Sequence, residues 1–356
     1  MAGGTGGHVF PAHAISESLS RSHRVIFYTD LRGKIFLDGL LGGISPTYEI
    51  CVLSIYPFGS NIRKKLKTLF ALAISILVMC TRFVMLRPAL VLGFGGYTTF
   101  PVLFAAVCTG VKIILHEQNA VLGTVNKIFA RCAEFIITSF ANIRGLQNRY
   151  TNKVLRLGTP IRKEFFEYDP YRYRKTDQKL KILILGGSQG SSFISTVATR
   201  ALVLLPKSIQ RQLSIHQQIS KDLESSTQAI YDKSSIYKYT ISSFFHNVAE
   251  LLYDADLVIA RSGASTISEI EYCKKPAILI PFAAAKHNHQ YYNARHLEEM
   301  GSAIICLERE STPENFSTIL SEVLTTGKLS VMKNNALRKN NDSIVAIAEK
   351  IDQLLG

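Results

Sequence analysis

The sequence is poor in cysteine and in long apolar runs. Its six cysteines are scattered over 356 residues, and no two of them are spaced as Cys-x-x-Cys. This spacing excludes a zinc or disulfide framework and is typical of a protein in a reducing compartment. A membrane-spanning helix needs roughly 18–20 consecutive apolar residues. The nearest run is Leu69–Cys80, which Thr81 and Arg82 close, so we expect neither a spanning helix nor an export signal.

Two nucleotide-binding signatures are also missing. No Gly-Lys-Ser/Thr triplet occurs, which excludes a P-loop nucleotide-binding site. No glycine turn reads Gly-x-Gly-x-x-Gly with an acidic residue about 20 residues further on, so the dinucleotide fingerprint is incomplete. The turn Gly3–His8 comes nearest to it, because Asp30 ends the strand that follows. NAD binding therefore stays open as an alternative at this point.

Acidic residues are too few to balance the basic ones. There are 41 lysines and arginines against 27 aspartates and glutamates, which gives a net charge of +14 with histidine neutral. This excess predicts an anionic partner, which could be nucleic acid, a phosphorylated small molecule or an acidic membrane surface. Apolar residues make up 47% of the chain, which excludes global disorder, and the length is that of two domains.

Short β-branched runs alternate with longer amphipathic stretches, which predicts an α/β fold with parallel strands. A polar stretch without periodicity, Glu164–Lys181, separates two such halves and is interpreted as a linker. Helices are expected over Pro11–Ser20, after the Thr312-Pro313 start signal and over Ser343–Leu355. The predicted strands are Val25–Tyr28, Leu90–Leu92, Lys112–Leu115, Phe135–Thr138, Lys153–Leu157, Lys181–Leu185, Leu213–His216, Lys238–Ile241, Leu257–Ala260, Ala277–Ile280 and Ala303–Cys306.

The beginning of the sequence departs from this pattern. In a βαβ unit a glycine turn follows a strand, yet only Met1 and Ala2 precede the turn Gly3–His8. The first strand is central in such a sheet, and its loss would expose its two neighbours. We therefore expect Met1 to occupy an internal position, with an apolar strand upstream of it.

Three glycine-rich turns follow predicted strands or begin helices, at Gly3–His8, Gly93–Tyr97 and Gly186–Gly190. Glycine permits positive φ and close approach of a ligand, and the helix that follows offers unpaired N–H groups to an anion. One such turn alone is usually structural. Three in two halves favour a phosphorylated ligand between the two domains.

Polar clusters stand at the same ends of the predicted strands. His8 is either a surface histidine that caps its turn or a general base, since its ordinary pKa suits proton removal near neutrality. The segment His116–Asn119 directly follows a buried strand, where polar residues commonly face a ligand. In the cluster Arg261–Glu269, the carboxylate of Glu269 either complements a helix dipole or accepts two ribose hydroxyls.

Six motifs occur in an order and at separations that resemble the MurG family of bacterial N-acetylglucosaminyltransferases, in glycosyltransferase family 28. They are G-G-T-G-G-H-V-F-P from residue 3, G-F-G-G-Y from 93, H-E-Q-N from 116, G-G-S-Q-G from 186, R-S-G-A-S-T-I-S-E from 261 and H-Q-Y-Y-N-A from 289. The resemblance covers essentially the whole chain. It implies the GT-B fold, two Rossmann-like domains facing a cleft with a C-terminal helix that crosses back to the first domain.

The resemblance also implies a reaction and its substrates. The family transfers GlcNAc from UDP-GlcNAc to the 4-hydroxyl of MurNAc in lipid I, a pyrophosphoryl-undecaprenol, with inversion at the anomeric carbon. The resemblance implies that residues 1–162, with the first strand missing, form a domain that binds the acceptor and the membrane and that residues 163–338 form a domain that binds UDP-GlcNAc. Residues 339–356 would form the C-terminal helix that packs on the first domain. The resemblance implies no cofactor and no nucleic acid. No metal ion is expected either, because no Asp-x-Asp motif is expected at the diphosphate and backbone amides, Arg162 and Ser188 would offset the leaving charge instead.

Site residues carry over by position in the motifs. His8 is expected to be the general base, with Glu117 as its rival. Thr5, Gly6 and Gly7 match the loop near the transferred sugar, and Asn119 and Gln290 match contacts to that sugar. The remaining substrate-binding matches are Arg162 in the donor site, Ser188 at the diphosphate, Phe245 at the uracil through its backbone, and Ala264, Ser265, Thr266, Ile267, Ser268 and Glu269 at the diphosphate and ribose.

A basic and apolar segment fits a lipid-linked acceptor. Four cations within 63–67 precede Leu69–Cys80, Arg82 and Arg87 follow it, and no acidic residue lies between Asn61 and Leu90. The segment is either a core helix with a solvated start or a surface that binds anionic lipid. The lipid acceptor favours the second interpretation. It would place the chain peripherally on the cytoplasmic face of the bacterial inner membrane.

Two other functions remain as alternatives. A UDP-GlcNAc 2-epimerase shares the fold and the sugar nucleotide but needs no lipid acceptor, and so would not need the basic and apolar segment. A non-catalytic sugar-nucleotide-binding scaffold at the membrane would not need His8, Glu117, Asn119 and Glu269 together. The transferase accounts for both features.

Overall fold

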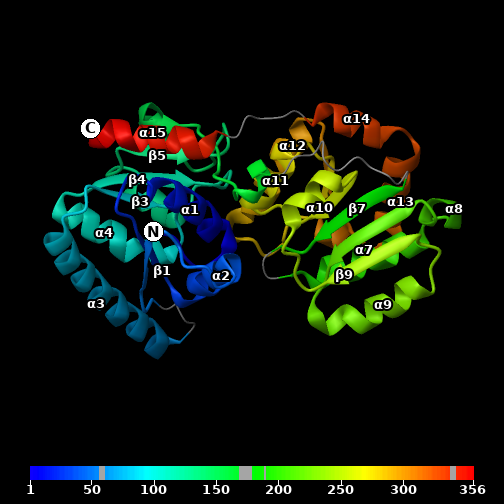
Figure 1. Cartoon of the computed structure of the whole chain (residues 1–356), viewed down its shortest axis with the longest axis horizontal. Helices are drawn as coiled ribbons and strands as arrows, with labels where there is room; N and C mark the ends of the chain where they lie inside the picture. Colours follow the sequence, from blue (N-terminus) through cyan, green and yellow to red (C-terminus); the bar gives the residue numbers. More distant parts are fainter. Residues whose placement is uncertain (56–60, 168–178, 188–189, 337–341) are drawn as a thin grey trace. The chain divides into compact units, whose positions relative to one another are not determined.

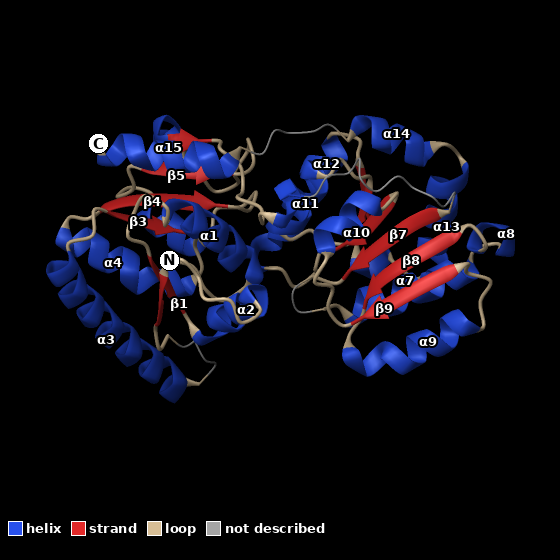
Figure 2. Ribbon diagram, in the orientation of Figure 1, coloured by secondary structure: helices blue, strands red, loops and turns tan. Residues whose placement is uncertain are grey.

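The computed structural model describes residues 1–55, 61–167, 179–187, 190–336 and 342–356, and for 62–67 it describes the backbone only. The chain divides into two units, Met1–Arg162 with Asn341–Gly356, and Lys163–Asn340 (Figure 1). Each unit contains parallel strands flanked by helices (Figure 2). The predicted α/β class with two Rossmann-like halves is confirmed.

The strands of the first unit form two separate parallel sheets. The first has the order β1-β2 and the second β3-β4-β5-β6. All the strands predicted for this half are present, and β2 is an addition. Its residues are half-buried or exposed, although the chain has a short apolar run at Ile50–Leu53 from which no strand was predicted. The strands are β1 (Ile26–Thr29), β2 (Glu49–Val52), β3 (Leu90–Gly93), β4 (Lys112–Glu117), β5 (Phe135–Thr138) and β6 (Val154–Leu155).

Met1 and Ala2 lie between the two sheets. The Ala2 amide donates to the carbonyl of Tyr28 in β1 at 3.1 Å, and the Phe94 amide, just after β3, donates to the Met1 carbonyl at 3.0 Å. The Met1 amino group donates to the Leu92 carbonyl at 2.8 Å, and burial lowers the pKa of this amino group to about 5. These two residues thus pair with strands on both sides. The expectation of a strand upstream of Met1 stays a prediction.

Helices cover both sheets of the first unit. The first begins at Gly6, earlier than the predicted Pro11, because the glycine turn itself forms the first helical turn. The last, predicted correctly at Ser343–Leu355, buries Ile347 and Ile351 in the core beside the first helix. The helical segments are α1 (Gly6–Leu19), α2 (Leu31–Leu41), α3 (Ile62–Leu86), η1 (Tyr97–Thr99), α4 (Phe100–Thr109), α5 (Thr124–Phe129), η2 (Asn148–Lys153) and α15 (Ser343–Leu355).

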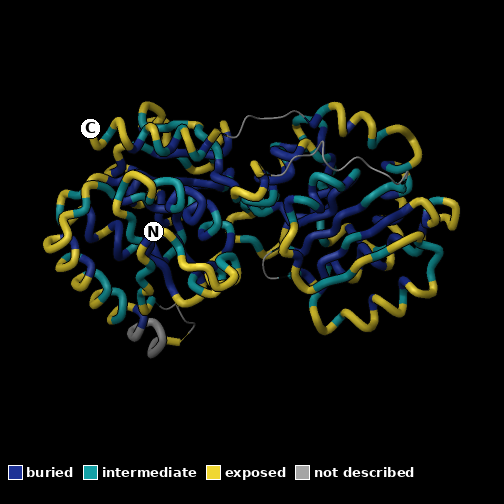
Figure 3. Tube along the Cα trace, in the orientation of Figure 1, coloured by how far each residue is buried: buried dark blue, intermediate teal, exposed yellow. Residues whose placement is uncertain are grey.

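Helix α3 has one buried and one exposed face. Met79 and Phe83 are buried in the core beside α4, whereas the opposite side is largely open (Figure 3). The stretch Thr68–Leu86 is long and apolar enough to cross a membrane, with 11% of it buried. The uninterrupted apolar run in this stretch ends before Thr81, as expected, so the spanning length rests on the mean hydropathy of the helix and not on an unbroken run. The exposed large apolar residues of α3 are Leu69, Phe70, Ile74, Leu77, Val78, Val84, Met85 and Leu86.

The second unit contains one parallel sheet with the strand order β12-β11-β10-β7-β8-β9. Chain order reverses between β7 and β10, and ligands of open α/β sheets bind at the carboxyl ends of the strands beside such a reversal. Every strand predicted for this half is present. They are β7 (Leu180–Leu185), β8 (Leu213–Gln218), β9 (Lys238–Ser242), β10 (Leu257–Ala260), β11 (Ala277–Leu279) and β12 (Ala303–Ile305).

The helices of the second unit pack against a sheet core of isoleucine and leucine. The start signal at Thr312 is confirmed, because its hydroxyl accepts from the Asn315 amide at 3.2 Å. The linker prediction largely falls on 168–178, outside the described residues. The helical segments are α6 (Glu164–Glu167), α7 (Ser192–Leu204), α8 (Lys207–Gln210), η3 (Lys221–Leu223), α9 (Glu224–Asp232), α10 (Val248–Asp254), α11 (Ala264–Tyr272), η4 (Lys286–Asn288), α12 (His289–Glu299), η5 (Glu308–Glu310), α13 (Pro313–Thr325) and α14 (Lys328–Asn335).

Candidate active site

In the first unit, the glycine loop and the second glycine turn approach each other closely. Thr5 is the exposed N-cap of α1, and its carbonyl accepts from the amides of His8 and Val9 at 3.1 Å. Gly6 and Gly7 form the first turn behind it. Gly96 has φ 81°, and a Cβ there would lie 3.2 Å from the carbonyl oxygen of Gly3. Glycine at this position therefore permits the close approach of the two turns.

His8 is half-buried where these turns meet. Its Nδ1 lies 2.8 Å from the carbonyl oxygen of Phe94, directly after β3. A carbonyl only accepts hydrogen bonds, so Nδ1 carries the proton and Nε2 carries the lone pair in the neutral ring. The side-chain nitrogen of Gln118 donates to the same carbonyl at 3.2 Å, and its contact with the protonated Nδ1 is not a hydrogen bond, because both nitrogens are donors. The ring is thus oriented with a basic nitrogen directed away from Phe94.

Glu117 ends β4 and is buried, with 2% of its surface exposed. Its Oε1 accepts from the backbone and side-chain N–H groups of Asn119 at 3.0 and 3.3 Å, and its Oε2 accepts from the Gly123 amide at 2.8 Å and the Asn126 side chain at 2.9 Å. Burial raises the pKa of this carboxyl, although the hydrogen bonds oppose the shift. Both oxygens hold the loop after β4 in place, which includes Asn119.

His116 is completely buried and is stacked on the ring of Phe94, with 4.9 Å between the ring centres. Its Nε2 donates to the Gly158 carbonyl at 3.0 Å. Burial lowers its pKa to about 4, so the ring is neutral at ordinary pH. The histidine of the H-E-Q-N motif therefore supports the loop rather than facing a ligand. The guanidinium of Arg162 lies 5.7 Å from the centre of the Phe10 ring on α1.

Sequence reasoning did not identify Asp30 as part of this region. Its buried carboxylate accepts from the amides of Gly4 at 3.0 Å and Gly33 at 2.8 Å. The other oxygen lies 3.5 Å from Arg32 and accepts from the Tyr97 hydroxyl at 3.4 Å. Asp30 thus ties both glycine turns to the end of β1. The only signal in the sequence was its place after a predicted strand, which suggested an NAD ribose contact instead.

In the second unit, α11 presents the cluster Ala264–Glu269 at the carboxyl end of β10. The first amides of a helix have no acceptor within it, and here they belong to Ala264, Ser265 and Thr266. The Ile267 amide bonds to the Gly263 carbonyl at 2.9 Å, and the Ile267 side chain lies in the core. Ser268 is half-buried, and Glu269 is only 6% exposed. The start of the helix can thus offer backbone N–H donors to a ligand, whereas its second turn can offer the carboxylate of Glu269.

The remaining predicted donor residues follow other strands of the same sheet. Gln290 begins α12, and its Oε1 accepts from the Phe282 amide at 3.0 Å. Phe245 follows β9, and its buried ring lies against His216. Ser188 lies outside the described residues. The glycine turn that contains it ends at Ser191, whose hydroxyl caps α7 by accepting from the Ile194 amide at 3.2 Å.

No group of three or more His, Cys, Asp or Glu side chains that could hold a metal ion occurs in the described part of the chain. One Asp-x-Asp spacing exists, at Asp254 and Asp256. These residues precede β10, at the end opposite to the glycine turn, and both bind Lys181. Its Nζ lies 2.6 Å from Asp254, and its amide donates to Asp256 at 3.0 Å.

The sequence matches two domains of one enzyme family. Residues 1–138 match the N-terminal domain of glycosyltransferase family 28, and residues 181–350 match its C-terminal domain. The chain belongs to glycosyltransferase family 28. A family 28 member is a glycosyltransferase, and the two α/β units are the two domains of its GT-B fold.

Relatives and a solved structure agree with this assignment. A Rickettsia canadensis protein is 35% identical, covering 100% of this chain and 98% of its own. A Rhodospirillum centenum protein is 36% identical, covering 91% and 85%. Both are named UDP-N-acetylglucosamine–N-acetylmuramyl-(pentapeptide) pyrophosphoryl-undecaprenol N-acetylglucosamine transferase. The crystal structure of Acinetobacter baumannii MurG aligns with a TM-score of 0.76 at 27% identity, over 99% of this chain and 98% of that one. The resemblance to the MurG family is confirmed.

Proposed function

We propose that the chain transfers GlcNAc from UDP-GlcNAc to the 4-hydroxyl of the MurNAc unit of lipid I, which gives lipid II for peptidoglycan. The observation that carries the proposal is the end-to-end match to family 28 relatives that are named for this transfer. The described residues of the six motifs lie at strand ends or helix starts, where an open α/β sheet binds ligands.

The second unit binds the sugar nucleotide in this proposal. The amides at the start of α11 face the diphosphate, since a helix N-terminus offers N–H donors and a partial positive charge. Glu269 accepts the ribose hydroxyls, Gln290 contacts the hydroxyls of GlcNAc, and the backbone at Phe245 binds the uracil. Ser188 and Arg162 join the amides in offsetting the charge of the departing UDP.

His8 is the general base in this proposal. An inverting displacement needs a base on the side of the anomeric carbon opposite to the leaving UDP. The hydrogen bond from Nδ1 to the Phe94 carbonyl supports this role, because it makes Nε2 the basic nitrogen. The contacts of Glu117 argue against the rival, since four N–H donors already occupy its two oxygens.

The exposed face of α3 binds the membrane that contains the acceptor. This face is apolar, and its buried side anchors the helix to the core through Met79 and Phe83. Because its buried side packs on the core, α3 would lie in the membrane surface rather than across the membrane. The cations at its start would add attraction to anionic lipid. The chain would then act peripherally, at the cytoplasmic face of the inner membrane.

One assay separates the proposal from its alternatives. UDP release from UDP-GlcNAc is measured with and without a water-soluble lipid I analogue. The transferase releases UDP only with the analogue and forms a disaccharide product. A 2-epimerase converts UDP-GlcNAc without an acceptor, and a scaffold does neither. Either of these results would overturn the proposal.

A further inference from the structure

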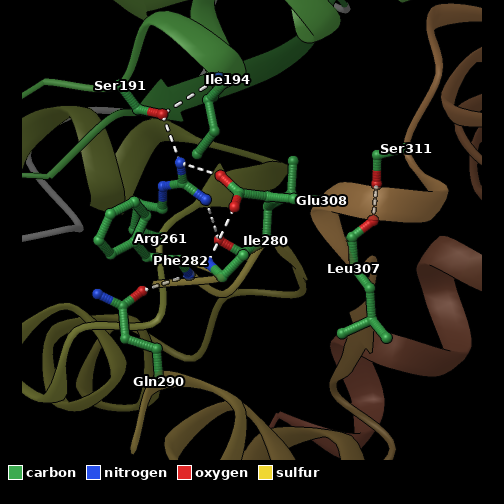
Figure 4. A network of polar contacts seen from close by, with 10 residues as sticks. Ser191, Ile194, Arg261, Ile280, Phe282, Gln290, Leu307, Glu308 and Ser311 are labelled. Atoms are coloured by element: carbon green, nitrogen blue, oxygen red, sulfur yellow. Dashed lines mark hydrogen bonds and ion pairs between the residues drawn. The ribbon is translucent and has the colours of Figure 1, made fainter. Parts of the chain in front are cut away.

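An ion pair between a buried arginine and a half-buried glutamate lies at the carboxyl ends of β7, β10 and β11 (Figure 4). Arg261 follows β10 directly, and Glu308 begins η5. The Arg261 Nη2 lies 2.5 Å from Glu308 Oε1, and their side chains are 10% and 16% exposed. A buried ion pair needs further hydrogen bonds to offset the cost of removing both charges from water. The partners that supply these bonds come from two loops, the one after β7 and the one after β11.

Arg261 holds the glycine turn after β7. Its Nη2 also donates to the hydroxyl of Ser191 at 2.8 Å, the group that caps α7, and its Nη1 donates to the Ile280 carbonyl at 3.1 Å. The stem of Arg261 packs beside the turn, since a Cβ on Gly187 would lie 3.9 Å from it. The position of this guanidinium is thus linked to the turn that contains Ser188.

Glu308 holds a second loop with its other oxygen. Its Oε2 accepts from the Ala283 amide at 2.9 Å, and the neighbouring Phe282 amide donates to Gln290 Oε1 at 3.0 Å. The bond from the Phe282 amide occupies the side-chain oxygen of Gln290. Figure 4 shows the amide nitrogen of Gln290 turned away from Phe282. The loop fixed by Glu308 thus determines how Gln290 is presented to a ligand.

We propose that Glu308 is a positioning residue for the sugar nucleotide. It holds Arg261 under the glycine turn with one oxygen and the loop beneath Gln290 with the other. The inference rests on the proposed function, which assigns these two loops to the diphosphate and the sugar of UDP-GlcNAc. A carboxylate suits this place because it accepts on both sides. A glutamine would keep one acceptor and turn its NH₂ group against either a guanidinium or an amide.

The test is the variant Glu308→Gln, measured first with UDP-GlcNAc alone by isothermal titration calorimetry. We expect the dissociation constant to rise about tenfold or more, since hydrogen bonds to a charged group are lost on one side. In steady-state kinetics with a lipid I analogue, KM for UDP-GlcNAc should rise by a similar factor. The acceptor KM should stay within about threefold, because Glu308 belongs to the second unit whereas His8 and the loop after β4 belong to the first.

The matched control is Glu310→Gln, on the same short helix. The Glu310 side chain is 63% exposed and pairs only with its neighbour Arg309 among the described contacts. This variant should leave every constant unchanged. If Glu308→Gln fails to fold, Glu308→Asp keeps the charge and should weaken UDP-GlcNAc binding with a smaller factor.

An unchanged dissociation constant in a folded Glu308 variant would overturn the inference, even if the melting temperature fell, because Glu308 would then be only structural. Equal losses in kcat and in both KM values would also overturn it. Failure of the proposed function looks different. There the wild type binds UDP-GlcNAc but releases no UDP with acceptor, and the calorimetric comparison still decides the role of Glu308.

Discussion

Replacing Glu117 by glutamine tests whether this carboxylate supports the loop or acts as the base. The change keeps the shape of the side chain but leaves one acceptor oxygen for four N–H donors. Its NH₂ group must face either the two donors of Asn119 or those of Gly123 and Asn126. Two buried or part-buried donors then lose this acceptor whichever way the amide is turned.

The cost follows from the number of donors left without an acceptor. An unsatisfied buried N–H costs about 1–3 kcal/mol, so two of them cost about 2–6 kcal/mol. Burial penalises the charged carboxylate, as its raised pKa indicates, and a neutral amide removes that penalty. We therefore expect the free energy of unfolding to fall by about 2–4 kcal/mol, in the lower part of the range.

Urea unfolding at pH 7.5 measures this loss, with Glu134→Gln as the control. Glu134 is an exposed carboxylate just before β5, and its replacement should change the free energy of unfolding by less than about 0.5 kcal/mol. The pH profile of kcat for the folded Glu117 variant should keep the position of its acid limb. The reasoning is refuted if stability is unchanged while kcat falls by 10² or more and the acid limb disappears, as loss of a general base requires.

The other predictions concern catalysis, donor binding, acid stability and the membrane. His8→Ala should lower kcat by about 10²–10⁴ with little change in the donor KM, and a small loss beside a large one in Glu117→Gln would transfer the role. Glu269→Ala should raise the donor KM about tenfold or more, and an unchanged KM would remove it from the ribose site. The folded-state pKa of His116, about 4, lies below its ordinary value, so the unfolded chain binds more protons between pH 4 and 6.5. The contribution of neutral His116 to the free energy of unfolding is complete above pH 6.5, and about 3 kcal/mol of it should be lost as the pH falls to 4. Urea unfolding at several pH values measures this loss, which should be absent in His116→Gln. Leu77→Glu on the open face of α3 should reduce binding to anionic vesicles about tenfold. Ile44→Glu, at a similarly exposed position in the loop after α2, should leave vesicle binding unchanged. Equal effects of the two variants would refute a specific membrane contact of α3.

The sequence by itself determined the strand framework. Strands buried on both faces of a parallel sheet have continuous apolar runs, so a run such as that in Lys181–Leu185 predicts a strand from the sequence alone. It also determined which glycine turn or polar loop follows each strand, because this depends only on the order of residues along the chain. The final helix was predicted to the residue, since its amphipathic period begins at a clear boundary. The strand β2 was not predicted, because a short apolar run such as Ile50–Leu53 does not by itself distinguish a strand from other structure.

Only the tertiary structure decided what the individual polar side chains do. The four polar residues of the H-E-Q-N motif were expected at a ligand-facing loop, with Asn119 on the sugar and Glu117 as the rival base. In the structure, His116 and Glu117 are buried and bonded to loops far along the chain or across the turn. The role of Glu308 had no sequence signal, because its partners come from the ends of different strands and meet only in the folded sheet. Likewise, the face that α3 exposes depends on which of its apolar residues pack against α4. Local pattern fixes backbone elements, whereas a side chain's chemistry depends on neighbours that are distant in the sequence.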